Sequence, residues 1–159
     1  MLAQPTRRDL QFLERLKFEN AMAGTLTMKQ VHEGLWLDPI RCSQNFRHFM
    51  NRLNHKTYGV RSGRRKKRLA VLPVQENSVS QRLHVHFIMS RPTWISYGDF
   101  IGLADECWKK TPYGYNSNSY SDNADAGWLI YILKSPTKHC LADSIDWENF
   151  YHPEMQLLN

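Results

Sequence analysis

The hydrophobic positions of this chain recur at two spacings, one typical of helices and the other of strands. Leucines at helical spacing predict a helix over residues 6–19. Residues 25–31 instead alternate between polar and apolar, as in a strand with one buried face. Thr25 and Thr27 would then share the face that points away from the core.

Three further helices follow from capping residues, prolines and apolar stripes. Asp38 and Pro39 are typical of a helix start, and Gly59 would end this helix. Its apolar face would consist of Ile40, Phe46, Phe49, Met50 and Leu53. Residues 96–110 and 126–136 predict the other two helices, each ended by a proline.

A β-hairpin is expected in the middle of the chain. Residues 69–76 and 82–90 have the apolar, β-branched character of strands, and the polar residues 77–80 would form the turn between them. Pro73 has no backbone N–H to donate, so the first of these strands would lie at a sheet edge or contain a bulge.

The order of these elements is compatible with an α+β fold. The length of 159 residues suits a single domain with a core of its own. Within it, residues 22–136 would form the body. They would follow the helix at 6–19 and precede a tail, residues 137–159, that packs against the body as a short helix.

Composition narrows the expected location of the protein. No apolar run approaches the roughly 20 residues that cross a membrane, and the early charges at Arg7, Arg8 and Asp9 do not suit a secretory signal. The three cysteines have unrelated spacings, which fit neither a disulfide framework nor a zinc site. We therefore expect a reducing compartment, either the cytoplasm or, for a viral protein, the host nucleus.

An excess of basic residues indicates a polyanionic partner. Lysine and arginine outnumber aspartate and glutamate by 21 to 15, so nucleic acid is the first candidate. The densest basic run comprises Arg61, Arg64, Arg65, Lys66, Lys67 and Arg68, and the preceding helix adds Arg41, Arg47 and Arg52. All are predicted to contact phosphates. A nuclear localisation signal or a solvated loop would also account for the run.

Three tyrosines fall in the polar segment 112–124, which is expected to be a loop with a short strand. Tyr113, Tyr115 and Tyr120 are candidates for stacking on nucleic-acid bases. The alternative is that they pack at the protein surface.

Two histidines, His84 and His86, are the strongest candidates for chemistry. Residues two apart on a strand point to the same face, so the two imidazoles could hold one divalent cation. The hairpin would return Glu76 toward them as a third ligand. Such a set would leave coordination positions for a substrate phosphate, and either Mn²⁺ or Mg²⁺ would suit it. The alternative is that all three are ordinary surface residues.

Tyr131 and Lys134 form a second candidate group, on the helix expected at 126–136. They are one turn apart and share a face of that helix, and Trp128 lies one turn earlier. A tyrosine can act as a nucleophile when its hydroxyl is activated. The alternative is a core tyrosine beside a surface lysine.

Three motifs in this order resemble those of the HUH endonucleases, in particular the single-tyrosine Rep nucleases that start rolling-circle replication. Residues 24–28 resemble the first motif, a strand of the Phe-Leu-Thr-Leu-Thr type. His84 and His86 match the second, a His-hydrophobic-His strand, and residues 131–134 match the third, Tyr-x-x-Lys on a helix. The resemblance covers about residues 22–136. It implies a fold of the α+β class with a central antiparallel sheet flanked by helices, a palm similar to ferredoxin-like and RRM folds.

The resemblance also implies cleavage and rejoining of single-stranded or hairpin DNA. Tyr131 would attack the phosphate to give a 5′-phosphotyrosine and a free 3′-hydroxyl, and Lys134 would contact the phosphate or the phenolate. The metal site would polarise the same phosphate. Many members have an acidic ligand before the second motif, and Glu76 is the best-placed candidate. Three further residues, Thr25, Thr27 and Trp128, are predicted to contact the DNA.

The chain departs from the larger Rep proteins in one respect. It has no Gly-x-x-x-x-Gly-Lys-Ser/Thr loop, so a helicase would be a separate partner or another part of a longer protein.

Three other interpretations compete with that of a Rep nuclease. A single-tyrosine transposase or a relaxase would use similar chemistry, but the late position of the tyrosine disfavours a relaxase. A non-catalytic basic module that binds nucleic acid and a metal-dependent phosphohydrolase that uses water would also fit the sequence.

Overall fold

The structure, a computed structural model, contains both helices and strands. It describes residues 7–64, 67–78, 81–122, 124, 128 and 144–157. In chain order they are α1 (Arg7–Arg15), β1 (Met22–Leu26), β2 (Val31–His32), β3 (Leu35–Trp36), α2 (Pro39–Tyr58), α3 (Arg61–Arg64), β4 (Val71–Ser78), β5 (Gln81–Met89), α4 (Tyr97–Lys109), β6 (Ser119–Asp122) and a 3₁₀ helix, η1 (Pro153–Leu157).

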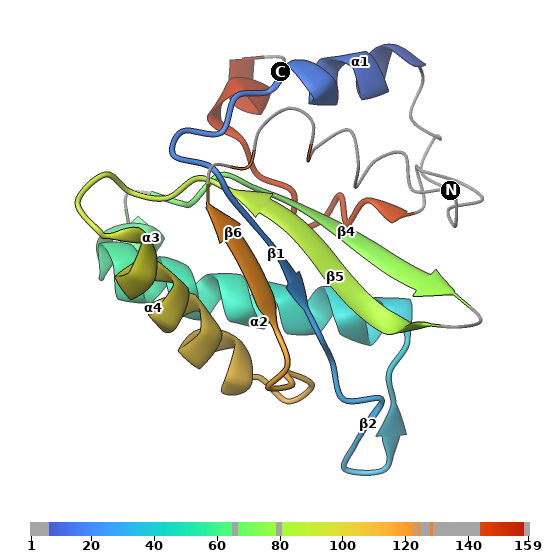
Figure 1. Cartoon of the computed structure of the whole chain (residues 1–159). Coiled ribbons are helices and arrows are strands. Elements are labelled where there is room, and N and C mark those ends of the chain that lie inside the picture. Colours follow the sequence, from blue (N-terminus) through green and yellow to red (C-terminus); the bar gives the residue numbers. More distant parts are fainter. Residues whose placement is uncertain are drawn as a thin grey trace.

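A four-stranded antiparallel sheet, in the order β4-β5-β1-β6, forms the centre of the fold (Figure 1). The predicted α+β class, with helices flanking an antiparallel sheet, is confirmed. The predicted hairpin is also confirmed, with Glu76 of β4 paired to His84 of β5. Pro73 lies on β4, an outer strand, as its missing N–H requires.

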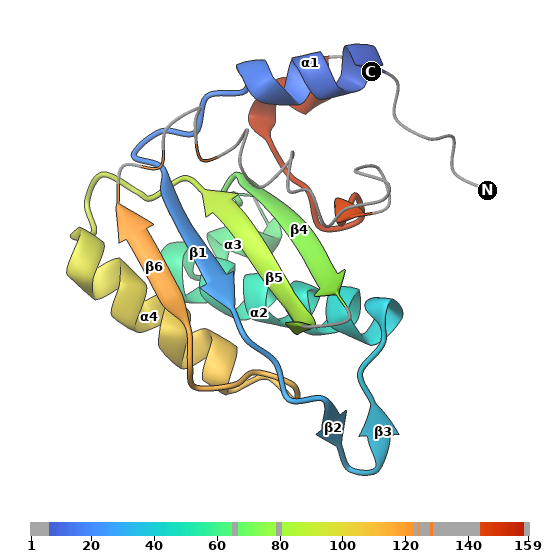
Figure 2. The ribbon, with the colours of Figure 1, turned by 45° about the vertical axis from the view of Figure 1, so that its right-hand side comes forward.

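Helices α2 and α4 cover one face of the sheet (Figures 1 and 2). The largest buried side chains of this layer are Phe46, Phe49, Phe87, Phe100 and Trp108. Burial of each such side chain contributes about 1.5–3 kcal/mol, so this layer supplies much of the folding free energy. Leu83 and Val85, which alternate with the two histidines along β5, also face this core.

The opposite face of the sheet is covered by α1 and the segment 144–157 (Figure 1). Leu13 and Leu16 pack there with Val74, Ile88 and Ile145. Ile88 follows His84 and His86 at two-residue steps on β5, so this is the face to which both histidines point. Trp128, Trp147 and Phe150 also pack against this cluster.

The predicted ends of α2 are confirmed. Asp38 caps the helix by accepting a hydrogen bond of 2.7 Å from the Arg41 N–H, and Gly59 ends it with a φ of 61°. The assignment of Ile40 to the apolar face is wrong, since Ile40 is 70% exposed. It stands two residues before the buried Cys42, about 200° around the helix axis, and therefore points away from the sheet.

Three other predicted boundaries need correction. α1 ends at Arg15 rather than at residue 19. The predicted strand 25–31 is divided, because β1 ends at Leu26 and residues 31–36 form a separate β2–β3 hairpin that projects from the body (Figure 2). The basic run begins in a short helix, α3, instead of a loop. No helix in the described ranges is both long and apolar enough to cross a membrane.

Candidate metal centre

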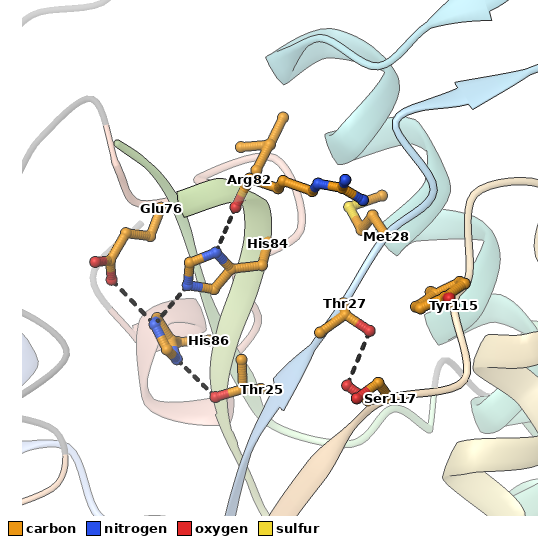
Figure 3. A pocket seen from close by; sticks show the side chains of 10 residues that line it. Thr25, Thr27, Met28, Glu76, Arg82, His84, His86, Tyr115 and Ser117 are labelled. Carbon is orange, nitrogen blue, oxygen red and sulfur yellow. Dashed lines mark hydrogen bonds and ion pairs between the residues drawn. The ribbon is translucent and has the colours of Figure 1, made fainter. Parts of the chain in front are cut away.

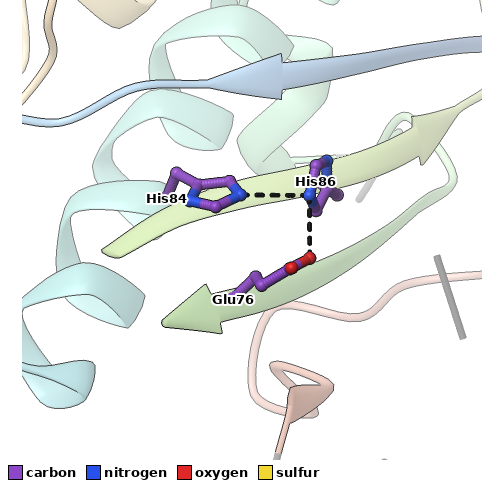
Figure 4. Close-up of side chains that lie close together, drawn as sticks. All are labelled: Glu76, His84 and His86. Carbon is purple, nitrogen blue, oxygen red and sulfur yellow. Dashed lines mark hydrogen bonds and ion pairs between the residues drawn. The ribbon is translucent and has the colours of Figure 1, made fainter. Parts of the chain in front are cut away.

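Three side chains that can ligate a metal meet on the β4–β5 hairpin (Figure 4). Nε2 of His86 lies 3.0 Å from a carboxylate oxygen of Glu76 and 3.1 Å from Nε2 of His84. One potential ligand atom from each residue lies within 4.8 Å of the other two. The predicted group of two histidines and one carboxylate is therefore present and could hold a metal ion.

Strand periodicity and hairpin register bring this group together. His84 and His86 are two residues apart on β5 and point to the same face, while Val85 points into the opposite core. Glu76 is the partner of His84 across the hairpin. Its side chain extends diagonally to His86, over a separation that long side chains span on one face of a sheet.

The backbone sets the orientation of the His84 ring. Nδ1 of His84 lies 2.7 Å from the carbonyl oxygen of Arg82. A carbonyl can only accept a hydrogen bond, so Nδ1 carries the proton and donates it. In a neutral His84, Nε2 then presents a lone pair toward His86. Ligation of a metal through Nε2 requires this tautomer.

The ring of His86 is held from the neighbouring strand. Its Nδ1 lies 2.9 Å from the hydroxyl oxygen of Thr25, the residue paired with His86 between β1 and β5. This contact turns the other ring nitrogen, Nε2, toward Glu76 and His84 (Figure 3). A partner on the second ring nitrogen is the usual support for a histidine that ligates a metal.

The electrostatics of the group favour a cation. Nε2 of His84 and the carboxylate of Glu76 are both acceptors, and both face Nε2 of His86. A proton on that nitrogen, or a metal ion in its place, relieves the repulsion between these lone pairs. Glu76 is only 9% exposed, so water contributes little to stabilising its charge.

The donor set fits a divalent metal with open coordination positions. Two imidazole nitrogens and one carboxylate oxygen are ligands typical of catalytic metal sites, where the remaining positions take water or substrate. His84 and His86 also have the orienting hydrogen bonds that such ligands need. Metal ligation is therefore within the chemistry of this group.

A pocket of about 570 Å³, which we call the metal pocket, opens beside these ligands (Figure 3). Its lining residues are Thr25, Thr27, Met28, Glu76, Arg82, Leu83, His84, His86, Tyr115 and Ser117. Hydroxyl groups, one guanidinium and one phenol ring thus surround the ligands. Tyr115 is 47% exposed, so its ring is accessible to a ligand.

The rim of the metal pocket is anchored to α4. The hydroxyl of Thr27 donates to the backbone oxygen of Ser117 at 2.9 Å, and the Thr27 N–H donates to the side-chain oxygen of Asn118 at 2.9 Å. Asn118 and Tyr120 in turn donate to the same oxygen of Asp105 on α4, at 3.0 and 2.9 Å. These contacts connect β1, the segment before β6 and α4.

Asp105 and Tyr120 shift each other's protonation. Burial raises the pKa of the Tyr120 phenol, and its hydrogen bond to Asp105 raises that pKa further. Partial burial also raises the pKa of the Asp105 carboxyl, but hydrogen bonds from Lys109, Asn118 and Tyr120 together hold it below its usual value. The network is therefore most stable with a charged aspartate and a neutral tyrosine.

The predicted phosphate-contacting residues of α2 lie away from the metal pocket, because α2 covers the other face of the sheet (Figure 1). Arg41 is paired with Asp38, the cap of its own helix. Arg47 forms an ion pair of 2.7 Å with Glu148, and Arg52 donates to His48 at 3.1 Å. Their predicted contact with DNA stays a prediction.

The basic run also lies apart from the metal pocket. Arg61 and Arg64 belong to α3, and Lys67 and Arg68 precede β4. Strand β4 begins at Val71, opposite Met89, whereas Glu76 and His84 are paired toward the other end of the hairpin. The described residues of the run therefore lie beyond the end of the sheet that is remote from the candidate ligands. Four predicted site residues, Arg65, Lys66, Tyr131 and Lys134, lie outside the described residues, as does the expected helix at 126–136 apart from Trp128.

Two polar residues of the metal pocket, Arg82 and Ser117, are not among the site residues predicted from the sequence. Arg82 stands two residues before His84 on the same strand, so the alternation that selected the histidines could also have found it. Ser117 carried no such signal, because its position depends on the contact between the segment before β6 and Thr27. Of the three loop tyrosines, Tyr113 and Tyr120 donate their hydroxyls to Leu35 and Asp105, and Tyr115 lines the pocket.

No protein-family profile, no curated protein and no solved structure matches this chain.

Proposed function

We propose that the protein is a metal-dependent nuclease of the HUH type that nicks and rejoins single-stranded DNA, in the manner of a Rep protein that starts rolling-circle replication. The observation that carries this proposal is the convergence of Glu76, His84 and His86 at the edge of an open pocket. A mononuclear site with free coordination positions suits the polarisation of a phosphodiester.

The arrangement of the motifs supports the proposal. The strand with the first motif, β1, is paired directly with the strand of the histidine motif, and Thr25 contacts His86. Trp128 packs on the face of the sheet to which the histidines point, and it stands three residues before Tyr131 in the sequence. The first and second motifs are therefore adjacent in the sheet. The third motif follows Trp128 in the sequence, and Trp128 packs on the face of the sheet to which the histidines point.

The proposed reaction is a transfer of a phosphoryl group to tyrosine. The hydroxyl oxygen of Tyr131 attacks the scissile phosphorus, its proton is lost, and the bond to the 3′ oxygen breaks to leave a 3′-hydroxyl. The 5′-phosphotyrosine conserves the energy of the bond, so a 3′-hydroxyl can reverse the step without ATP. Lys134 neutralises charge on the phosphate or the phenolate.

A bound Mn²⁺ or Mg²⁺ would act as a Lewis acid on the scissile phosphate, held by His84, His86 and Glu76. Thr25 and the Arg82 carbonyl keep the two imidazoles in place. Arg82 adds a positive charge to the metal pocket, and the exposed Tyr115 ring offers a surface for a base. These groups suit an extruded single strand. A helicase, either a separate protein or another part of a longer protein, would have to supply that strand from duplex DNA.

The test is capture of a covalent adduct. The protein is incubated with a degenerate single-stranded oligonucleotide pool, and with circular single-stranded DNA, in Mn²⁺ or in EDTA, and is then run on a denaturing gel. We expect a Mn²⁺-dependent shifted band that is lost in Tyr131→Phe and His84→Ala. The matched controls, Tyr97→Phe and His48→Ala, lie outside the metal pocket and should retain the band.

The outcome separates the nickase from the competing functions. An adduct that persists in Tyr131→Phe would contradict the assignment of the nucleophile. Cleavage of the DNA without any adduct would indicate a phosphohydrolase that uses water. Binding of single strands without cleavage, on circular DNA and across the degenerate pool, would leave a non-catalytic nucleic-acid-binding module as the better description.

A further inference from the structure

A second pocket, of about 370 Å³, lies where the segment before β4 meets the segment after β5. It is lined by Lys17, Glu19, Tyr58, Arg68, Leu69, Ala70, Ser90, Arg91, Pro92, Thr93, Trp94, His152, Pro153 and Glu154. We call it the Trp94 pocket. Its volume is toward the small end of ligand sites, which are about 300–1,000 Å³, so it suits one compact group.

This pocket is separate from the metal pocket. Arg68 and Leu69 come before the start of β4, and Ser90 and Arg91 come after the end of β5. The paired residues Glu76 and His84 lie toward the far end of the same two strands. The two pockets therefore occupy opposite ends of the sheet and share no lining residue.

Trp94 provides an aromatic surface in this pocket. It is 66% exposed, which is unusual for so large an apolar side chain. Its ring meets that of Tyr58 at 5.9 Å between centroids and at an angle of 67°. This edge-to-face contact fixes the Trp94 ring in place. Because two thirds of the residue stays exposed, a face of the ring is open to a planar ligand that stacks on it.

Arg91 provides an unsatisfied donor. One of its terminal nitrogens donates to the carbonyl oxygen of Ile95 at 2.7 Å, which fixes the guanidinium. Its Nε is buried and has no hydrogen-bond partner in the part of the chain that the structure describes. A buried donor without a partner costs free energy, and a small shift of the Arg91 side chain toward an anion in the pocket would pair this donor with one of the anion's oxygens.

Two more cations face the same space. Arg68 and Lys17 line the pocket, and neither forms an ion pair among the described residues. The two carboxylates of the pocket, Glu19 and Glu154, are exposed to water, which screens their repulsion of an anion. The pocket thus combines a free aromatic face with three basic side chains.

We propose that the Trp94 pocket binds one nucleotide of a single-stranded nucleic acid, with the base stacked on Trp94 and the phosphate held by Arg68 and Arg91. A base and a phosphate form one ligand with a planar apolar part and an anionic part, which matches what the pocket offers. The site requires neither a metal nor cleavage. Arg68 ends the basic run, so the strand can continue along those residues.

The experiment uses the full chain in EDTA, which removes any contribution from the metal centre. The probe is an oligo(dT) of ten nucleotides. Its binding is measured by the quenching of tryptophan emission and by the fluorescence anisotropy of a labelled copy of the oligonucleotide. The variants are Trp94→Ala and Arg68→Ala, both at exposed positions. The matched controls are Trp36→Ala, an exposed tryptophan on β3, and Arg15→Ala, an exposed arginine that lines neither pocket.

We expect Trp94→Ala to remove most of the quenching and to weaken binding about 5- to 150-fold, the range for loss of one base–aromatic stack. Arg68→Ala should weaken binding more than Arg15→Ala does, and Trp36→Ala should bind as the wild type. Equal affinity in all four variants would overturn the proposal. Competition by dTMP would support it by placing a single nucleotide in the pocket, whereas displacement by inorganic phosphate with no effect of dTMP would overturn it.

These outcomes are distinguishable from failure of the nickase proposal. His86→Ala should abolish the covalent adduct and leave oligo(dT) binding in EDTA unchanged. Trp94→Ala should retain the chemistry of the metal pocket at saturating DNA. An oligo(rU) arm tells whether the bound strand is DNA, RNA or either.

Discussion

The hydroxyl of Thr25 and Nδ1 of His86 lie 2.9 Å apart across the paired strands β1 and β5. This contact joins the threonine strand to the histidine strand and turns Nε2 of His86 toward Glu76 and His84. Thr25 was predicted to contact DNA, and the structure also places it as a support for the ring of His86, a candidate metal ligand.

Replacement of Thr25 should weaken metal binding without unfolding the protein. Thr25→Val keeps the shape of the side chain but leaves Nδ1 of His86 without its partner, and the loss of such a partner lowers metal affinity about 10- to 100-fold. Thr25→Ser should restore most of the affinity. Calorimetric titration with Mn²⁺ measures the affinity of both variants. Equal affinity in the wild type and in Thr25→Val would contradict the role of Thr25 in positioning His86.

Mn²⁺ should raise the thermal stability of the folded protein. A ligand that binds only the folded state at 100 times its Kd stabilises it by about 2.7 kcal/mol. We expect a higher Tm in Mn²⁺ for the wild type and no change for His86→Ala or Glu76→Gln. His48→Ala, an exposed histidine on α2, is the control and should respond as the wild type. A similar rise in His86→Ala would place the bound metal elsewhere.

Acid should remove the stabilising effect of Asp105. The pKa of this carboxyl is lowered in the folded state, because hydrogen bonds from Lys109, Asn118 and Tyr120 exceed the raising effect of burial. A lowered pKa stabilises the fold above the unfolded value of about 3.9, and this stabilisation is lost as pH falls through the folded value.

Asp105→Asn should therefore lower the urea midpoint at pH 7 and should differ less from the wild type at pH 3. The pH dependence of the stability that Tyr120 contributes has the opposite sign. The pKa of its phenol is raised in the folded state, so this stability is lost as the solution becomes strongly alkaline. A difference between the wild type and Asp105→Asn that grows toward pH 3 would contradict this account.

Gly24 is required by close packing rather than by its backbone freedom. A Cβ at this position would lie 2.7 Å from the Phe87 ring and 2.8 Å from the backbone oxygen of Ser119. Gly24→Ala should therefore destabilise the fold by about 1–3 kcal/mol, as other forced insertions into a packed core do.

Gly102→Ala is the matched control, because no atom lies within 4 Å of a Cβ there and the residue is inside α4. It should stabilise the protein by about 0.8–1 kcal/mol through the helix propensity of alanine. Chemical denaturation measures both changes, and a neutral Gly24→Ala would mean that β1 and β6 can separate without cost.

Local periodicity and capping in the sequence were enough to predict the β4–β5 hairpin, the ends of α2 and the three candidate metal ligands. The two-residue period of strands placed His84 and His86 on one face, and the turn between two apolar segments brought back Glu76. The Asp38–Pro39 pair defined the start of α2 because capping acts within one turn. These features depend on neighbours within a few residues, or on a single short hairpin.

Only the tertiary structure decided which distant segments meet. The insertion of β1 beside β5 makes Thr25 a partner of His86, and the packing of α2 on the other face removes its arginines from the metal pocket. The Trp94 pocket joins segments on either side of the β4–β5 hairpin with residues near both ends of the described chain. Strand order and helix placement depend on how the complete core packs, and no local period encodes that packing.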